Sequence, residues 1–163
     1  MKPDRCSLNR GGIPEHRALP AGLIQPKGNL HMVNAEELQE LRAALMNERL
    51  PTDLQQKLHY LTGDSLIHRF VAENSRLIGD CLMAAYDGRF RGSSQKCLER
   101  LLKVLAYVRK NDDVIPDWEV DGFVDDQQEL RAALTEFHGV IQAFKSWRLR
   151  YQVPAMWNER VST

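Results

Sequence analysis

The sequence predicts an all-α fold: a compact bundle of about five helices behind an extended N-terminal arm. Three observations support this prediction. From residue 34 onward, apolar residues recur every three or four positions, which is the spacing of a helix that buries one face. Residues that favour helix N-termini precede several of these stretches. The chain has no strand-rich region and no internal repeat, and its 163 residues suffice for one domain with a core.

The predicted organisation has three parts. Residues 1–33 form an extended or partly disordered arm, because four of the seven prolines and four of the ten glycines fall within residues 1–32. Within this arm, residues 23–33 could form a small hairpin around a turn at 26–29. Residues 34–154 form the helical domain, and residues 155–163 form a tail.

Capping patterns mark the first predicted helices. Asn34 with Glu37 three residues later matches a capping box. Pro51 stops this helix, because proline cannot continue the backbone hydrogen bonding. Thr52 or Asp53 is then expected to cap a short second helix.

Two further helices follow. Asp64 or Ser65 begins a long one whose wide apolar face predicts burial against more than one neighbour, and Gly88 stops it. Ser93 or Ser94 caps the next, which runs toward residue 110.

The last predicted helix covers residues 125–152, with Asp125 or Asp126 as its cap. At about 1.5 Å per residue it would span about 40 Å, which is longer than a compact domain of this size needs. Its C-terminal half, with Trp147 and Tyr151, is therefore expected to project or to pack on a partner.

Composition limits the partners and the cellular compartment that we expect for this protein. The formal net charge is zero, so no overall field favours nucleic acid or membrane. The three cysteines have no paired spacing; Cys81 and Cys97 fall on apolar helical faces, whereas Cys6 lies in the arm. The sequence shows neither a signal peptide nor a membrane span, and we expect a soluble, cytoplasmic protein.

Charge is unevenly distributed around residue 110. Residues 89–110 carry seven Lys or Arg and one acid, Glu99, whereas residues 111–129 carry eight acids and no base. The simplest interpretation is that the two segments neutralise each other within the fold. The chemically unusual part of the chain is thus the acidic loop, residues 112–129.

A motif spans this loop. Ala106-Tyr107 precedes two runs, Asp113-Val114-Ile115-Pro116-Asp117 and Gly122-Phe123-Val124-Asp125-Asp126. The pattern resembles the YkvA-like domain of unknown function, in which a helix ends in a similar run and a Gly-aromatic-aliphatic-Asp-Asp run opens the next helix. The resemblance implies a helix–loop–helix unit and no known activity. Its polar surroundings differ from the family's apolar ones, so membrane attachment is not implied.

The same residue types suit a purely structural corner. Pro116 keeps the preceding residue out of the helical region, and Gly122 permits backbone conformations closed to other residues. Ile115, Trp118 and Phe123 would fill the corner with apolar side chains.

A divalent-cation site is an alternative interpretation of the loop, because clustered carboxylates repel one another unless a cation offsets them. Residues 117–128 partly match a Ca²⁺-binding EF-hand loop, but position twelve is Gln128 where a Glu is needed. A looser Ca²⁺ or Mg²⁺ site would use five acids: Asp113, Asp117, Asp121, Asp125 and Asp126. No other cofactor is expected.

Catalytic patterns are incomplete. Residues 36–40 match one half of the Mg²⁺-binding pattern of all-α nucleotide pyrophosphohydrolases, but the second half is missing. Solvated charges on a helix face explain the run better. No histidine pairing, phosphate loop or nucleophile motif stands out, and no catalytic residue can be named.

Nucleic-acid binding is a further alternative. It would use the basic face within residues 89–110: Arg89, Arg91, Lys96, Arg100 and Lys103. A solvated face that pairs with nearby acids is favoured over this interpretation.

The sequence thus predicts a non-catalytic helical module that binds another protein or itself. Trp147, Tyr151 and Trp157 are the expected anchors, because aromatic side chains dominate protein interfaces. The alternative is a metal-dependent enzyme or metal-regulated module centred on the acidic loop.

Overall fold

The computed structural model describes residues 33–61, 63, 65–110 and 122–151. These residues form six helices and no strand, which confirms the all-α prediction. The helices are α1 (Ala35–Met46), α2 (Thr52–Tyr60), α3 (Leu66–Tyr86), α4 (Gln95–Arg109), α5 (Val124–Glu136) and α6 (His138–Tyr151). The arm, its hairpin, Cys6, Trp157 and the acids at 113, 117 and 121 lie outside the described residues.

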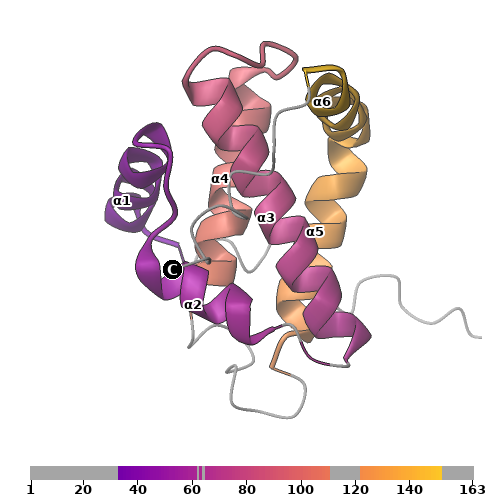
Figure 1. Ribbon diagram of the computed structural model, residues 1–163. Helices are drawn as coiled ribbons and strands as arrows, with labels where there is room; N and C mark the ends of the chain where they lie inside the picture. The colour runs from indigo at the N-terminus through magenta and orange to yellow at the C-terminus, as the bar shows by residue number, and fades with distance from the viewer. Residues whose placement is uncertain (1–32, 62, 64, 111–121, 152–163) are drawn as a thin grey trace, which may run out of the picture.

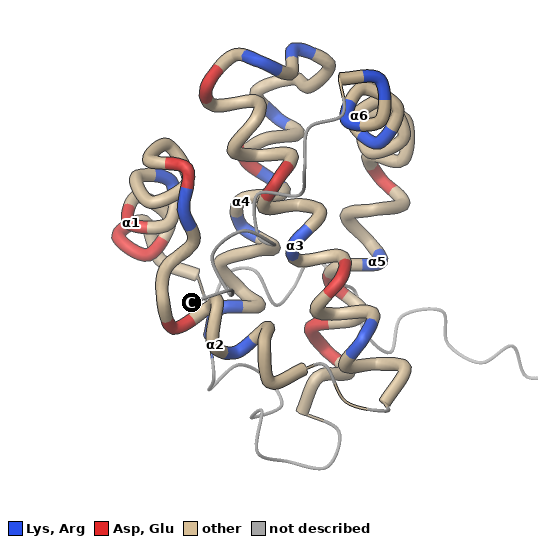
Figure 2. The backbone as a smooth tube through the Cα atoms, viewed as in Figure 1, with Lys and Arg blue, Asp and Glu red and all other residues tan. Residues whose placement is uncertain are grey.

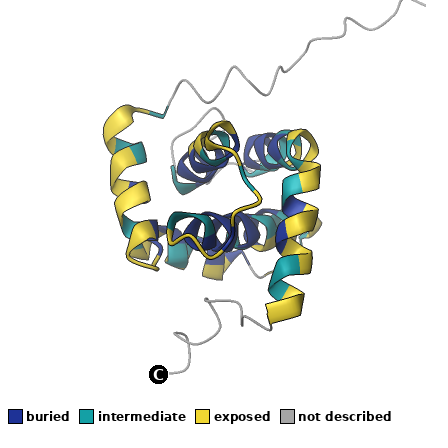
Figure 3. Cartoon of the chain, turned by 90° about the horizontal axis from the view of Figure 1, so that it is seen from above, coloured by how far each residue is buried: buried dark blue, intermediate teal, exposed yellow. Residues whose placement is uncertain are grey.

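Three helices, α3, α4 and α5, form the centre of the bundle (Figure 1). α4 runs antiparallel to α3, and α5 runs parallel to α3. α1 and α2 pack against α3 and α4 on one side, while α6 lies on the opposite side and crosses one end of the bundle (Figures 1 and 3). None of the described helices combines the length and apolarity needed to cross a membrane.

α3 is the central element of the core. Residues 77–84 are all buried, which requires neighbours on every side of the helix. α1, α4 and α5 supply them, and the wide apolar face predicted for this helix is confirmed. Cys81 and Cys97 are both buried free thiols, as predicted. Burial raises the pKa of Cys81 to about 12, so this thiol stays protonated.

Three helices begin with a side chain that caps the helix N-terminus. The Asn34 side chain accepts a hydrogen bond from the Glu37 N–H at 2.9 Å, and the Glu37 carboxylate accepts one from the Asn34 N–H at 3.0 Å. The predicted capping box is therefore confirmed. The hydroxyls of Ser65 and Ser94 accept from backbone N–H groups at the starts of α3 and α4.

The predicted cap of the second helix is wrong. α2 begins at Thr52 directly after Pro51, and no side chain caps it. Pro51 is the residue before the helix, with φ −53° and ψ 140°. Its carbonyl accepts the backbone N–H of Gln55 at 3.0 Å, and Thr52 and Asp53 lie inside the first turn, past the capping position.

The prediction of one continuous last helix over residues 125–152 is also wrong, because the chain bends at Phe137. α5 ends at Glu136, and Phe137 has φ −111° and ψ 30° before α6 begins at His138. Gly139 and its neighbours are weak helix formers. The bend returns Ile141 and Phe144 to the core, where both are buried, whereas a straight helix would carry them past the end of the bundle.

Candidate functional site

The acids at the start of α5 are buried. Asp125, Asp126 and Glu129 are 3%, 0% and 0% exposed, respectively. The prediction that Asp125 or Asp126 caps this helix is wrong, since the helix begins after Phe123 without a side-chain cap. The three carboxylates lie in the first turns of α5, where the positive end of the helix dipole stabilises negative charge.

A buried hydrogen bond joins α4 to α5. The Tyr107 hydroxyl donates to the Asp125 carboxylate at 2.7 Å, and both side chains are almost inaccessible to solvent. A hydrogen bond to a buried charged acceptor contributes about 1.5–3 kcal/mol. This bond therefore fixes the two helices on either side of the acidic loop.

Glu129 is a buried acid whose pKa departs strongly from its ordinary value. Its carboxylate has no hydrogen-bond partner there, and the Arg100 guanidinium lies 3.9 Å away. Burial raises the pKa of Glu129, Arg100 opposes the rise, and Asp125 adds to it, which brings the pKa to about 7. Arg100 also pairs with Glu136 at 3.4 Å, so its charge is shared between two acids.

The structure brings together only part of the predicted cation site. Asp125 and Asp126 lie on α5, and the other three predicted ligands are outside the described residues. Within residues 33–61, 63, 65–110 and 122–151, no group of three His, Cys, Asp or Glu side chains is arranged to hold a metal ion. The cation site stays a prediction.

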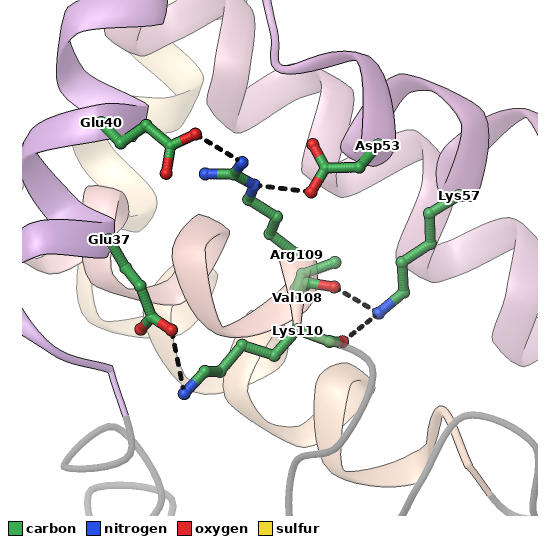
Figure 4. Close-up of polar contacts among 7 residues, drawn as sticks. All are labelled: Glu37, Glu40, Asp53, Lys57, Val108, Arg109 and Lys110. Atoms are coloured by element: carbon green, nitrogen blue, oxygen red, sulfur yellow. Dashed lines mark hydrogen bonds and ion pairs between the residues drawn. The ribbon is translucent and has the colours of Figure 1, made fainter.

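The basic end of α4 pairs with α1 and α2. Arg109 bonds Glu40 and Asp53, each at 2.9 Å, and Lys110 pairs with Glu37 at 3.3 Å (Figure 4). Glu37 and Glu40 belong to the acidic run at 36–40, so two of its acids serve this ionic contact. These partners lie on the first two helices and not in the acidic segment, so the predicted mutual neutralisation of residues 89–110 and 111–129 is not what these pairs show. Because residues 111–121 lie outside the described part of the chain, it stays a prediction.

Lys57 of α2 covers the C-terminal end of α4 (Figure 4). Its ammonium donates to the Val108 carbonyl and, at 2.6 Å, to the Lys110 carbonyl. These carbonyls lack helical partners, and the dipole there favours a cation. The same ammonium lies 5.4 Å from the centre of the Phe123 ring just before α5. Lys57 therefore contacts the chain on both sides of the acidic loop.

An aromatic series leads from the core to the surface of α6. The buried rings of Phe90 and Phe144 meet edge to face, with centroids 5.3 Å apart. Trp147 stacks on Phe144 at 5.7 Å, and Tyr151 lies 5.6 Å from Trp147. Tyr151 is 65% exposed, whereas Trp147 is half-buried against the core. Of the predicted anchors, Tyr151 is accessible and Trp147 partly so.

α6 is a basic helix (Figure 2). It carries Lys145, Arg148 and Arg150 and has no Asp or Glu between residues 138 and 151. Arg148 pairs with Asp80 at 3.2 Å. No described carboxylate lies within ion-pair distance of Lys145 or Arg150.

The predicted basic face is divided. Arg89 pairs with Asp87 and, at 3.6 Å, with Glu48, while Arg100 turns toward the acids of α5. Arg91, Lys96 and Lys103 are exposed. Two of its five cations are therefore already bound by carboxylates, which weakens the case for a phosphate-binding surface.

Comparison with known proteins found no matching family model, no similar curated protein and no similar solved structure. The resemblance to the YkvA-like domain therefore stays a prediction. Of its motif, the structure describes Tyr107 and residues 122–126, and these supply the end of α4, the start of α5 and the bond between them.

Several structurally important contacts were not predicted from the sequence. Lys57 and Tyr107 contact residues far along the chain, and no local spacing reveals such contacts. Glu129 could have been singled out, because it follows Asp125 by four residues and so shares its helix face. Its burial, which sets its chemistry, depends on the packing of α4.

Proposed function

We propose that this protein is a non-catalytic helical module that binds an acidic segment of another protein through the exposed end of α6. The observation that carries the proposal is Tyr151, an aromatic side chain that is 65% exposed and rests on Trp147. Exposed aromatic residues on a rigid support are favoured interface anchors.

Packing beneath Tyr151 supports a preorganised surface. Trp147 contacts both Phe90 and Phe144, which are buried. The partner therefore need not order the anchor on binding, and this lowers the entropy cost of association.

Charge supports an acidic partner. Lys145 and Arg150 are not paired with described carboxylates, and α6 has no acid of its own. A contact between two copies of α6 would bring like charges together, which is unfavourable. A distinct acidic partner is thus favoured over self-association through this helix.

The test compares full-length wild type with three variants, Tyr151→Ala, Arg150→Glu and Tyr60→Ala, as bait for proteins from a cell extract. Tyr151→Ala removes the anchor, and Tyr60→Ala removes a more exposed tyrosine on α2, which is 82% exposed. We expect a partner that wild type and Tyr60→Ala retain, that Tyr151→Ala and Arg150→Glu lose, and that moderate salt releases. The proposal fails if the variants and wild type capture the same proteins, or if Tyr151→Ala disrupts only a homodimer seen by sedimentation.

A further inference from the structure

A shallow groove opens between α3 and α5, near the start of α6. It has a volume of about 300 Å³ and is lined by Phe70, Arg131, Leu134, Thr135 and His138. Phe70 of α3 and Leu134 of α5 are half-buried and supply its apolar lining, whereas the three polar side chains are exposed. The groove does not involve Tyr151 or Trp147, so it is separate from the surface proposed above.

The polar side chains that line the groove come from α5 and α6. Thr135 follows Arg131 by four residues on α5, which places both on the same helix face. His138 begins α6 directly beyond the bend. Guanidinium, hydroxyl and imidazole groups can each donate a hydrogen bond, so three donor side chains line the same groove as the apolar Phe70 and Leu134.

The Arg131 side chain contacts an aromatic ring and forms no ion pair with a described carboxylate. Its guanidinium carbon lies 4.9 Å from the centre of the Phe70 ring, a cation–π contact. The Arg131 guanidinium donates no hydrogen bond to another described residue, so its N–H donors remain available to a ligand. No described Asp or Glu lies within ion-pair distance of Arg131, so its charge is not already neutralised by a neighbouring carboxylate.

We propose that this groove binds a small organic carboxylate with an aromatic or branched aliphatic body. Arg131 would hold the carboxylate through paired N–H donors, the geometry that guanidinium groups favour. Thr135 and His138 would complete its hydrogen bonding, and the apolar body would lie on Phe70 and Leu134. A groove of about 300 Å³ is at the small end of ligand sites, so the ligand has the size of a single ring.

The test uses phenylacetate as the probe and the isotope-labelled full-length chain. We expect saturable shifts at the backbone amides of Phe70, Arg131, Leu134 and Thr135, with a millimolar dissociation constant. The neutral isostere phenylacetamide should bind at least about tenfold more weakly, because it cannot form the charge-assisted pair.

Three variants test whether phenylacetate binds in the groove. Arg131→Gln should weaken phenylacetate binding by about tenfold or more, and its exposed position makes loss of the fold improbable. Lys145→Gln removes a cation on α6 outside the groove and should leave binding unchanged. Tyr151→Ala should also leave it unchanged, so this test can fail independently of the protein-binding proposal.

Three outcomes would overturn the inference. The first is the absence of saturable shifts at the groove with millimolar phenylacetate. The second is equal binding by phenylacetamide or by the Arg131→Gln variant. The third is binding of a Glu-rich peptide in the groove without binding of phenylacetate, since the groove would then belong to a protein interface.

Discussion

Glu129 makes the stability of this protein depend on pH in an unusual direction. The pKa of this buried carboxyl rises from an ordinary 4.5 to about 7 because burial disfavours its charged form. The folded state thus binds the proton more tightly than the unfolded chain does. The resulting stabilisation is complete below about pH 4.5 and is lost as the pH rises through about 7.

The size of the effect follows from the same values. A rise from 4.5 to about 7 corresponds to about 3 kcal/mol of unfolding free energy. Glu129→Gln replaces the carboxyl with a group of similar shape that cannot ionise. We expect the variant to match wild type near pH 5 and to exceed it by about 2–3 kcal/mol near pH 8. The melting temperature near pH 8 should rise by about 5–10 °C.

Wild type and Glu129→Gln are unfolded in urea across this pH range, and their free energies of unfolding are subtracted at each pH. The subtraction removes the contributions of histidines and other acids, which are the same in both proteins. Glu136→Gln is the matched control, because Glu136 lies on the same helix, pairs with the same Arg100 and is exposed. The free energy of unfolding of Glu136→Gln, relative to wild type, should not rise with pH. A Glu129→Gln difference that stays constant between about pH 5 and pH 8 would refute the reasoning.

Three further substitutions test the packing. Tyr107→Phe removes the hydroxyl that Asp125 accepts from, and urea unfolding should show a loss of about 1.5–3 kcal/mol with unchanged helicity. Lys57→Met uncovers the carbonyls at the end of α4, and the same assay should show a loss of about 1–2 kcal/mol. Gly139→Ala meets no atom within 4 Å and needs no positive φ, so it should raise stability by about 0.5–1 kcal/mol; a loss there would mean that the bend before α6 requires glycine.

Errors in the sequence-based prediction come from places where several local solutions are allowed. The apolar pattern of residues 125–152 is compatible with one straight helix or with two joined at Phe137. Only the position of the core, which receives Ile141 and Phe144, favours the bend. Asp125 and Asp126 likewise have the chemistry of caps, but they lie inside the first turn of α5 because packing on α4 places them there.

By itself, the sequence determined the helical class and most helix boundaries, because capping and apolar periodicity act over three or four residues. The caps at Asn34, Ser65 and Ser94 are of this kind. Only the tertiary structure decided the partners of charged groups, since Arg109 meets acids 56 and 69 positions away. It also decided the burial of Glu129. Desolvation depends on what surrounds a group in space, and neighbours along the chain do not reveal it.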